Sequence, residues 1–242
     1  MTAAQLPRID PERTLGELVA ERPSRARVLE RAGIDYCCHG DRRLVDAATD
    51  AGLDPGALAA ALAVVTDTEG AHIDRLDPVS LVEHIVSTHH AYLHEELPLL
   101  DALATKVAGA HGGRHPELAE VARLMGEIRL DLEPHLAKEE AVLFPAIRRA
   151  ADGPTSQALG SLSEPIGVML AEHDRAGDLL ARLRQAAGDY VVPDDGCASY
   201  RSLYERLAHL EADTHRHIHL ENNVLFPAVA GTDQLGSSVY RR

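Results

Sequence analysis

Hydrophobic residues recur every three or four positions along most of the chain, which is the spacing that places them on one face of an α-helix. Ala, Leu, Glu and Arg are frequent, and runs of β-branched residues are short. This pattern predicts an all-α protein. It indicates four long helices, separated by Gly- and Pro-containing segments, near residues 79–108, 116–150, 163–187 and 198–230.

The first quarter of the chain predicts a smaller helical unit. Ser24 is placed to cap a short helix that Gly33 would end, and Asp54 followed by Pro55 is typical of a helix start. Turn-forming residues without a periodic apolar face follow this unit. We therefore expect a small helical domain over residues 1–68, a linker over 69–78, a four-helix bundle over 79–232 and a tail over 233–242.

The second and fourth long helices contain the same pattern. HLAKEEAVLFPAI (residues 135–147) matches HIHLENNVLFPAV (217–229), with His, Glu, Val-Leu-Phe-Pro and Ala in register at an offset of 82 residues. An alignment of His90 with His173 relates the first and third helices more weakly. The chain thus uses a helical hairpin twice, which predicts a bundle with internal pseudo-twofold symmetry.

In each repeated segment a histidine and a glutamate lie on the apolar face of the helix. His135 and Glu139 form one pair and His217 and Glu221 the other, each four residues apart and aligned with Val and Leu residues. Burial of a carboxylate is costly unless a metal ion or another partner compensates it. The two pairs therefore predict a buried metal centre.

The other two helices are each expected to supply one histidine. His173 is the only histidine of the third helix and lies on its apolar face. In the first helix His90 is the repeat partner of His173, and His94, one turn further on, is the alternative. The predicted ligands are His90, His135, Glu139, His173, His217 and Glu221.

Four imidazoles and two bridging carboxylates can hold two metal ions and leave positions for an oxo or hydroxo bridge and a small ligand. This mixture of ligands suits iron, with zinc and manganese as alternatives. Asp131 and Asp213 each precede a predicted ligand histidine by four residues. We expect each to accept a hydrogen bond from the outward ring nitrogen of that histidine. The alternative is that both are ordinary solvated carboxylates. His215 and His219 are expected on a solvated polar face.

The net charge of −14 argues against nucleic acid and anionic membrane surfaces as partners. No apolar run approaches the length of a membrane-spanning helix, and the first residues lack a signal-peptide core. Cys37 and Cys38 are adjacent and only one further cysteine, Cys197, is present. This is not a disulfide framework, so a reducing cytoplasm is expected.

The segments HLAKEEAVLFP, AEHDRAGDLL, HIHLENNVLFP and GIDYCCHG together resemble the Ric (repair of iron centres) di-iron proteins of the hemerythrin-like superfamily, over nearly the whole chain. The family's ligand pattern matches the six residues proposed above. Hemerythrins that carry oxygen are similar in fold but use five histidines and two carboxylates, and this chain has no evident fifth histidine.

The resemblance implies a protein with two iron ions that helps repair iron–sulfur clusters damaged by nitric oxide or oxidative stress, by donating iron to cluster proteins. It also implies nitric oxide or O2 as small ligands, and a nitric oxide reductase-like activity in some members. A reversible binder or sensor of a diatomic gas and a simple iron-holding protein are the competing functions. A homodimer is compatible with the sequence.

The family's small domain reads Asp-aromatic-Cys-Cys-Gly-Gly, and here His39 replaces the first glycine. Because neighbouring cysteines cannot form the spaced pair of a zinc knuckle, transient chemistry is expected at Cys37 and Cys38: redox exchange, or brief capture of iron or nitric oxide. Two small buried side chains without chemistry are the alternative.

Overall fold

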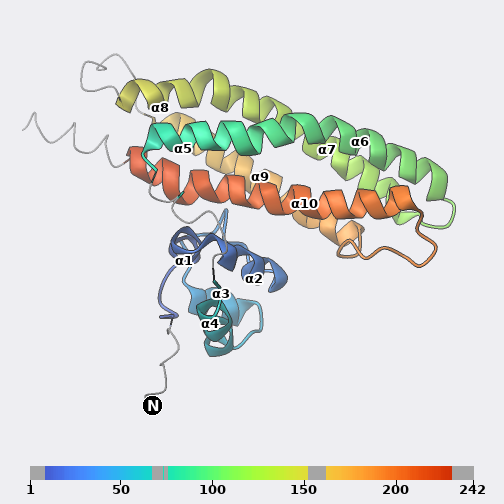
Figure 1. Cartoon of the computed structure of the whole chain (residues 1–242), viewed down its shortest axis with the longest axis horizontal. Coiled ribbons are helices and arrows are strands. Elements are labelled where there is room, and N and C mark those ends of the chain that lie inside the picture. Colours follow the sequence, from blue (N-terminus) through green and yellow to red (C-terminus); the bar gives the residue numbers. More distant parts are fainter. Residues whose placement is uncertain (1–8, 67–72, 74–75, 152–161, 231–242) are drawn as a thin grey trace, which may run out of the picture.

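The computed structural model describes residues 9–66, 73, 76–151 and 162–230. Four long antiparallel helical segments form a bundle, and a layer of short helices lies against one side of it (Figure 1). Among the described residues there is no strand, and Thr14 and Arg43 form an isolated bridge. The all-α expectation is confirmed. None of the described helices is both long enough and apolar enough to cross a bilayer.

The bundle helices begin and end close to the expected residues. The first consists of α5 (Pro78–Ile85), a π-helical turn η3 (Val86–His90) and α6 (Ala91–His111). The second consists of α7 (Glu117–Lys138), the π-helical turn η4 (Glu139–Leu143) and α8 (Phe144–Ala151). The third is α9 (Ser163–Ala186). The fourth consists of α10 (Ala198–Leu220), the π-helical turn η6 (Glu221–Leu225) and a helical continuation over 226–230.

Three of the four bundle helices widen into a π-turn at the same level. In the two repeated segments a proline, Pro145 or Pro227, follows the turn directly after a phenylalanine. Proline has no N–H and its ring clashes with the carbonyl four residues earlier, so the helix in front of it cannot keep the α-helical hydrogen-bond pattern. The Phe-Pro dipeptides thus explain two of the widened turns, which contain the buried glutamates; such turns are frequent at functional sites.

Over its described residues, 9–66, the small domain consists of four short helices and one 3-10 turn. They are α1 (Leu15–Glu21), η1 (Pro23–Arg25), α2 (Ala26–Arg31), α3 (Leu44–Asp50) and α4 (Pro55–Ala63). Thr14 and Glu17 form a capping box at the start of α1, and Asp54 caps α4 through the N–H of Ala57. The expectation for Ser24 was wrong: it lies inside the 3-10 turn, and Arg25 is the residue before α2.

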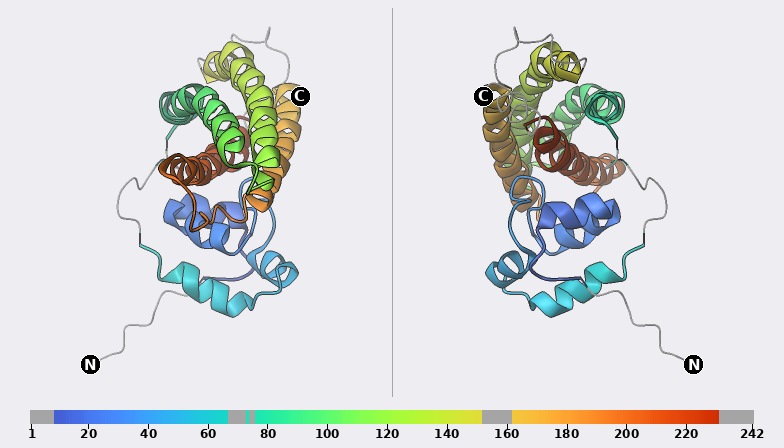
Figure 2. Two further views of the ribbon diagram at one scale, coloured as in Figure 1. Left: turned by 90° about the vertical axis from the view of Figure 1, so that its right-hand side faces the viewer. Right: turned by 90° about the vertical axis from the view of Figure 1, so that its left-hand side faces the viewer.

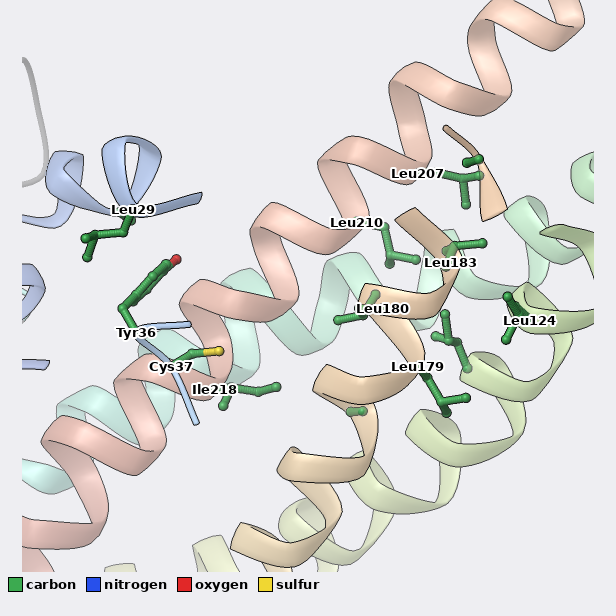
Figure 3. Packing of buried hydrophobic residues seen from close by; sticks show 14 of the residues in the cluster. Leu29, Tyr36, Cys37, Leu124, Leu179, Leu180, Leu183, Leu207, Leu210 and Ile218 are labelled. Atoms are coloured by element: carbon green, nitrogen blue, oxygen red, sulfur yellow. The ribbon is translucent and has the colours of Figure 1, made fainter. Parts of the chain in front are cut away.

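The small domain packs directly onto the bundle and shares a hydrophobic core with it. Leu29 and Tyr36 of the small domain belong to the same buried cluster as Ile218 of α10, and Figure 3 shows Cys37 beside Ile218. The two views of Figure 2, from opposite sides, show the short helices against α10. The His215/His219 face of α10 is therefore not solvated as expected: His219 is only 4% exposed, and its ring lies 5.6 Å from that of Tyr36.

Glycine makes a close contact between the two parts possible. The N–H of Gly16 donates to the carbonyl of Gly40, and a Cβ at Gly40 would lie 2.0 Å from the Oδ1 of Asn223. Asn223 in turn donates to the carbonyl of Cys37, 3.0 Å away. His39, which replaces the other glycine of the motif, does not disturb this path, because its side chain points outward and is 60% exposed.

Candidate metal centre

The four bundle helices bring all six predicted ligands together in the interior. Each of these side chains is at most 2% exposed, and both glutamates are fully buried. They form two overlapping groups that share both glutamates. One group contains His90, His217, Glu139 and Glu221, and the other contains His135, His173, Glu139 and Glu221.

Short distances within each group show where a cation fits. The Nε2 atoms of His90 and His217 are 3.2 Å apart, and those of His135 and His173 are 3.1 Å apart. Glu221 reaches both groups, with one oxygen 3.1 Å from the Nε2 of His217 and the other 3.1 Å from that of His173. An imidazole pair that points its lone pairs at one spot, with a carboxylate oxygen beside it, is the arrangement of metal ligands rather than of a hydrogen-bonded network.

Glu139 occupies the opposite side of the same space. Its Oε2 lies 3.4 Å from the Nε2 of His90 and 3.4 Å from that of His135, so it also faces both groups. Within the described part of the chain, neither oxygen of Glu139 or of Glu221 receives a hydrogen bond. Two buried carboxylates in this condition would cost several kcal/mol without compensation (~3 or more). The residues present therefore fit a cationic metal.

The pKa values of the buried groups are shifted in the chain without metal, as expected for carboxylates that lack compensation. Burial and the neighbouring Glu221 raise the pKa of Glu139 well above its usual range. Burial also acts to raise the pKa of Glu221, but His217 and His173 outweigh it and hold that pKa well below the usual range. Burial lowers the pKa of His217 to about 4, which keeps this imidazole neutral and ready to bind a metal.

The outward ring nitrogen of His90 is held by a carboxylate. Its Nδ1 lies 2.9 Å from the Oε1 of Glu140, the residue after Glu139. The same oxygen of Glu140 lies 3.0 Å from the Nε2 of His94, whose side chain is 46% exposed. The structure thus places His90 at the centre and His94, the alternative in the sequence, behind Glu140.

The two aspartates expected behind the ligand histidines have other partners. Asp131 accepts from Arg175 of α9, and the Nδ1 of His135 instead lies 3.0 Å from the Oε2 of Glu172. Both oxygens of Asp213 lie 3.1 Å from the Nδ1 of His89. The expectation for Asp131 and Asp213 was wrong because the neighbouring helices supply a cation and an imidazole that compete for these carboxylates.

His89 is buried beside the centre without joining it. Its ring stacks on that of His217 at a centroid distance of 5.9 Å and an interplanar angle of 8°. No hydrogen-bond partner for the Nδ1 of His217 lies among the described residues. His217 is therefore positioned by ring packing, whereas the other three histidines are positioned by hydrogen bonds.

His173 is linked to the small domain through an amide. Its Nδ1 lies 2.7 Å from the Oδ1 of Asn222, and the Nδ2 of Asn222 donates to the carbonyl of Cys37 at 3.2 Å. Asn222 occupies the repeat position of Glu140. One half of the bundle thus holds its histidine with a carboxylate. The other half uses an amide that also anchors the segment between α2 and α3 that contains Cys37 and Cys38, which we call the cysteine loop.

Both cysteines of that loop are free thiols. Cys37 is buried, Cys38 is partly exposed, and their Sγ atoms are 3.8 Å apart, far beyond a disulfide bond. The Sγ of Cys38 lies 3.5 Å from the carbonyl oxygen of His173 and can donate to it. Cys197, at the start of α10, is far along the chain from this loop and exposed.

Comparison with known proteins agrees with the fold and with cation binding by the bundle. Residues 81–229 match the hemerythrin HHE cation binding domain, which covers more than half of the chain. Residues 11–66 match a second family model described as a domain of unknown function (DUF542). The bundle thus defines a hemerythrin-like cation-binding protein.

Relatives that align over almost their whole length define the family more closely. The iron-sulfur cluster repair protein ScdA of Staphylococcus epidermidis is 32% identical over 92% of this chain and 100% of its own length. The iron-sulfur cluster repair proteins YtfE of Cronobacter sakazakii and Escherichia coli O157:H7 are 35% and 34% identical over 91% of this chain and 97% and 98% of their own lengths. The chain belongs to this family of iron–sulfur cluster repair proteins, as its sequence motifs predicted.

Proposed function

We propose that this protein holds two iron ions in the bundle and supplies iron for the repair of iron–sulfur clusters. The observation that carries the proposal is that two groups of four ligands share Glu139 and Glu221. Glu221 then has one oxygen for each group, and the Oε2 of Glu139 lies near both. The hemerythrin-like family match supports a cation, and the mixture of imidazole and carboxylate suits iron. The names of the relatives support the repair role.

The chain's own residues perform three tasks at this site. Glu139 and Glu221 compensate the charge of the cations, and the neutral imidazoles complete each group. Glu140, Glu172 and Asn222 fix the rings of the ligand histidines from outside. When bound, a pair of iron ions would supply open coordination positions for an oxo or hydroxo bridge and for a small ligand such as nitric oxide or O2.

The recipients we propose are iron–sulfur proteins whose clusters have been damaged by nitric oxide or oxidative stress. The site favours delivery over permanent storage because both ions would share the two carboxylates and no fifth histidine joins the six ligands in the described chain. We place this activity in the bacterial cytoplasm, where unpaired cysteines stay reduced.

The test is anaerobic reconstitution with ferrous iron, followed by metal counting and incubation with an apo iron–sulfur protein. We expect two irons per chain and transfer of iron to the acceptor. Glu139→Ala and Glu221→Ala should each reduce the iron content to one or none. His94→Ala is the matched control, because His94 is a histidine of the same helix that stands behind Glu140, and it should keep both irons.

Two outcomes would contradict the proposal. Unchanged iron content in both glutamate variants would remove the bridging role. A stable O2 adduct, together with no transfer of iron to the acceptor, would instead support a reversible gas carrier.

A further inference from the structure

The cysteine loop of the small domain contains a second cluster of metal-binding side chains, outside the bundle. One ligand atom from each of Asp35, Cys37 and Cys38 lies within 4.8 Å of the other two. We propose that Asp35, Cys37 and Cys38 bind one divalent transition-metal ion, of the zinc or ferrous type, at this separate site. This inference goes beyond the proposed function, because it holds whatever the bundle binds.

The spacing of the two sulfur atoms fits a single ion. A tetrahedral ion with metal–sulfur bonds of about 2.3 Å holds two thiolates about 3.8 Å apart. The Sγ atoms of Cys37 and Cys38 are 3.8 Å apart. The thiol of Cys37 donates to the Oδ1 of Asp35 at 3.2 Å, so its proton already occupies the space between sulfur and carboxylate that a cation would take.

The loop holds these groups in place before any ion binds. The Oδ1 of Asp35 accepts from the N–H groups of Cys37 and Cys38, at 2.9 and 3.0 Å. The Oδ2 of Asp35 lies 2.7 Å from the Nδ1 of His39. The carbonyl of Cys37 is fixed from the other side by the amides of Asn222 and Asn223. Such pre-organisation reduces the entropy lost when a ligand binds.

A cavity of about 520 Å³ gives an ion access to the cluster. Four acidic residues, Glu30, Asp174, Asp178 and Glu211, line it together with the three proposed ligands. The one arginine of the wall, Arg184, is paired with Glu211 at 2.8 Å. A concave surface with this excess of negative charge raises the local concentration of cations.

The chemistry of binding is an exchange of two protons for one ion. Each thiol must lose its proton before its sulfur can bind, so one divalent ion displaces two protons to solvent and forms two metal–sulfur bonds. The two thiolates neutralise the ion, and the carboxylate of Asp35 supplies the third ligand. Neither oxidation nor reduction is involved. Soft thiolate ligands favour Zn²⁺ and Fe²⁺ over Mg²⁺ or Ca²⁺.

The experiment uses the full chain with Cys197→Ser, so that Cys37 and Cys38 are the only thiols. The probes are Zn²⁺, with the free thiols counted by a thiol reagent, and Co²⁺, whose thiolate complexes show charge-transfer absorption that nitrogen and oxygen ligands do not give. We expect one equivalent of Zn²⁺ to protect both thiols and one Co²⁺ per chain to give the sulfur absorption. Both signals should vanish in Cys37→Ser/Cys38→Ser.

Asp35→Asn provides the matched variant, because the amide oxygen can still accept from both backbone N–H groups while the charge is lost. It should fold normally and weaken Zn²⁺ binding by about tenfold or more. Thiols that stay fully reactive with Zn²⁺ bound to the chain, or Co²⁺ without sulfur absorption, would overturn the proposal. The iron content of the bundle is measured in the same samples, so a failure of the proposed function is distinguished from a failure here.

Discussion

The Oδ1 of Asn222 lies 2.7 Å from the Nδ1 of His173. The repeat places Glu140 in the same relation to His90, at 2.9 Å. A carboxylate that accepts a hydrogen bond from the outward ring nitrogen makes a metal-binding imidazole a stronger ligand than a neutral amide does. The reason is that the carboxylate stabilises the positive charge that the metal induces on the ring. The internal symmetry of the bundle is thus broken at this pair of positions, and Asn222 belongs to the half that contacts the cysteine loop.

The first prediction exchanges these two groups. Glu140→Gln gives His90 an amide partner and should weaken metal binding by about 10- to 100-fold, whereas Asn222→Asp should strengthen it. Because Asn222 also donates to Cys37, Asn222→Asp should in addition loosen the small domain. Metal affinity is measured by competition with a chelator. Equal affinities in wild type and both variants would show that the outer partners do not tune the site.

The second prediction concerns how much the buried carboxylates of the metal centre lower the free energy of unfolding of the metal-free protein. In the metal-free chain Glu139→Gln removes a buried carboxylate whose oxygens have no hydrogen-bond partner among the described residues. It should raise the free energy of unfolding of the metal-free protein by about 1–3 kcal/mol, while it lowers metal binding. Thermal unfolding with and without metal measures both effects. A variant that destabilises the metal-free chain would mean that Glu139 is satisfied there.

Most residues of the metal centre can be predicted from the sequence, but few of the residues that contact them can. His135, Glu139, His217 and Glu221 are recognisable because a histidine and a glutamate spaced to share an apolar helix face are costly to bury without a metal or another partner. The repeat then selects His90 over His94. Glu140 and Asn222 could have been found in the same way, since each follows the glutamate of a repeated His-Glu pair and the two align.

Glu172 and Asp213 show why the remaining contacts could not be predicted. A helical face angle places a carboxylate on one helix but does not show what the opposite helix presents. Arg175 and His89 of neighbouring helices decide the partners of Asp131 and Asp213. Docking of the small domain was missed for a related reason: the face with His219 and Asn223 looks polar, and its contacts are made by backbone groups of the cysteine loop.

The third prediction tests this docking. Gly40→Ala would place its Cβ 2.0 Å from the Oδ1 of Asn223 and should destabilise the protein by about 1–3 kcal/mol. Asn223→Ala should relieve the clash, so the double variant should lose less stability than the sum of the single variants. Gly109→Ala in α6 is the control: nothing lies within 4 Å of the added Cβ, and a helical alanine should be neutral or stabilising. Additive effects in the cycle would contradict the contact.

The last prediction concerns the pH dependence of stability. Burial lowers the pKa of His219 to about 4, whereas an unfolded chain has a histidine pKa of about 6.5. The unfolded state therefore binds a proton at His219 between these pH values and the folded state does not, so stability should fall as the pH drops from about 6.5 to about 4. The full difference corresponds to about 3 kcal/mol.

His219→Gln removes the titration and should flatten this part of the stability curve in chemical unfolding of the metal-loaded protein. His209→Gln is the control, since His209 is exposed and contacts the hydroxyl of Tyr92. A wild-type curve that is no steeper than that of His219→Gln would show that His219 is protonated in the folded chain and that the small domain does not exclude water from it.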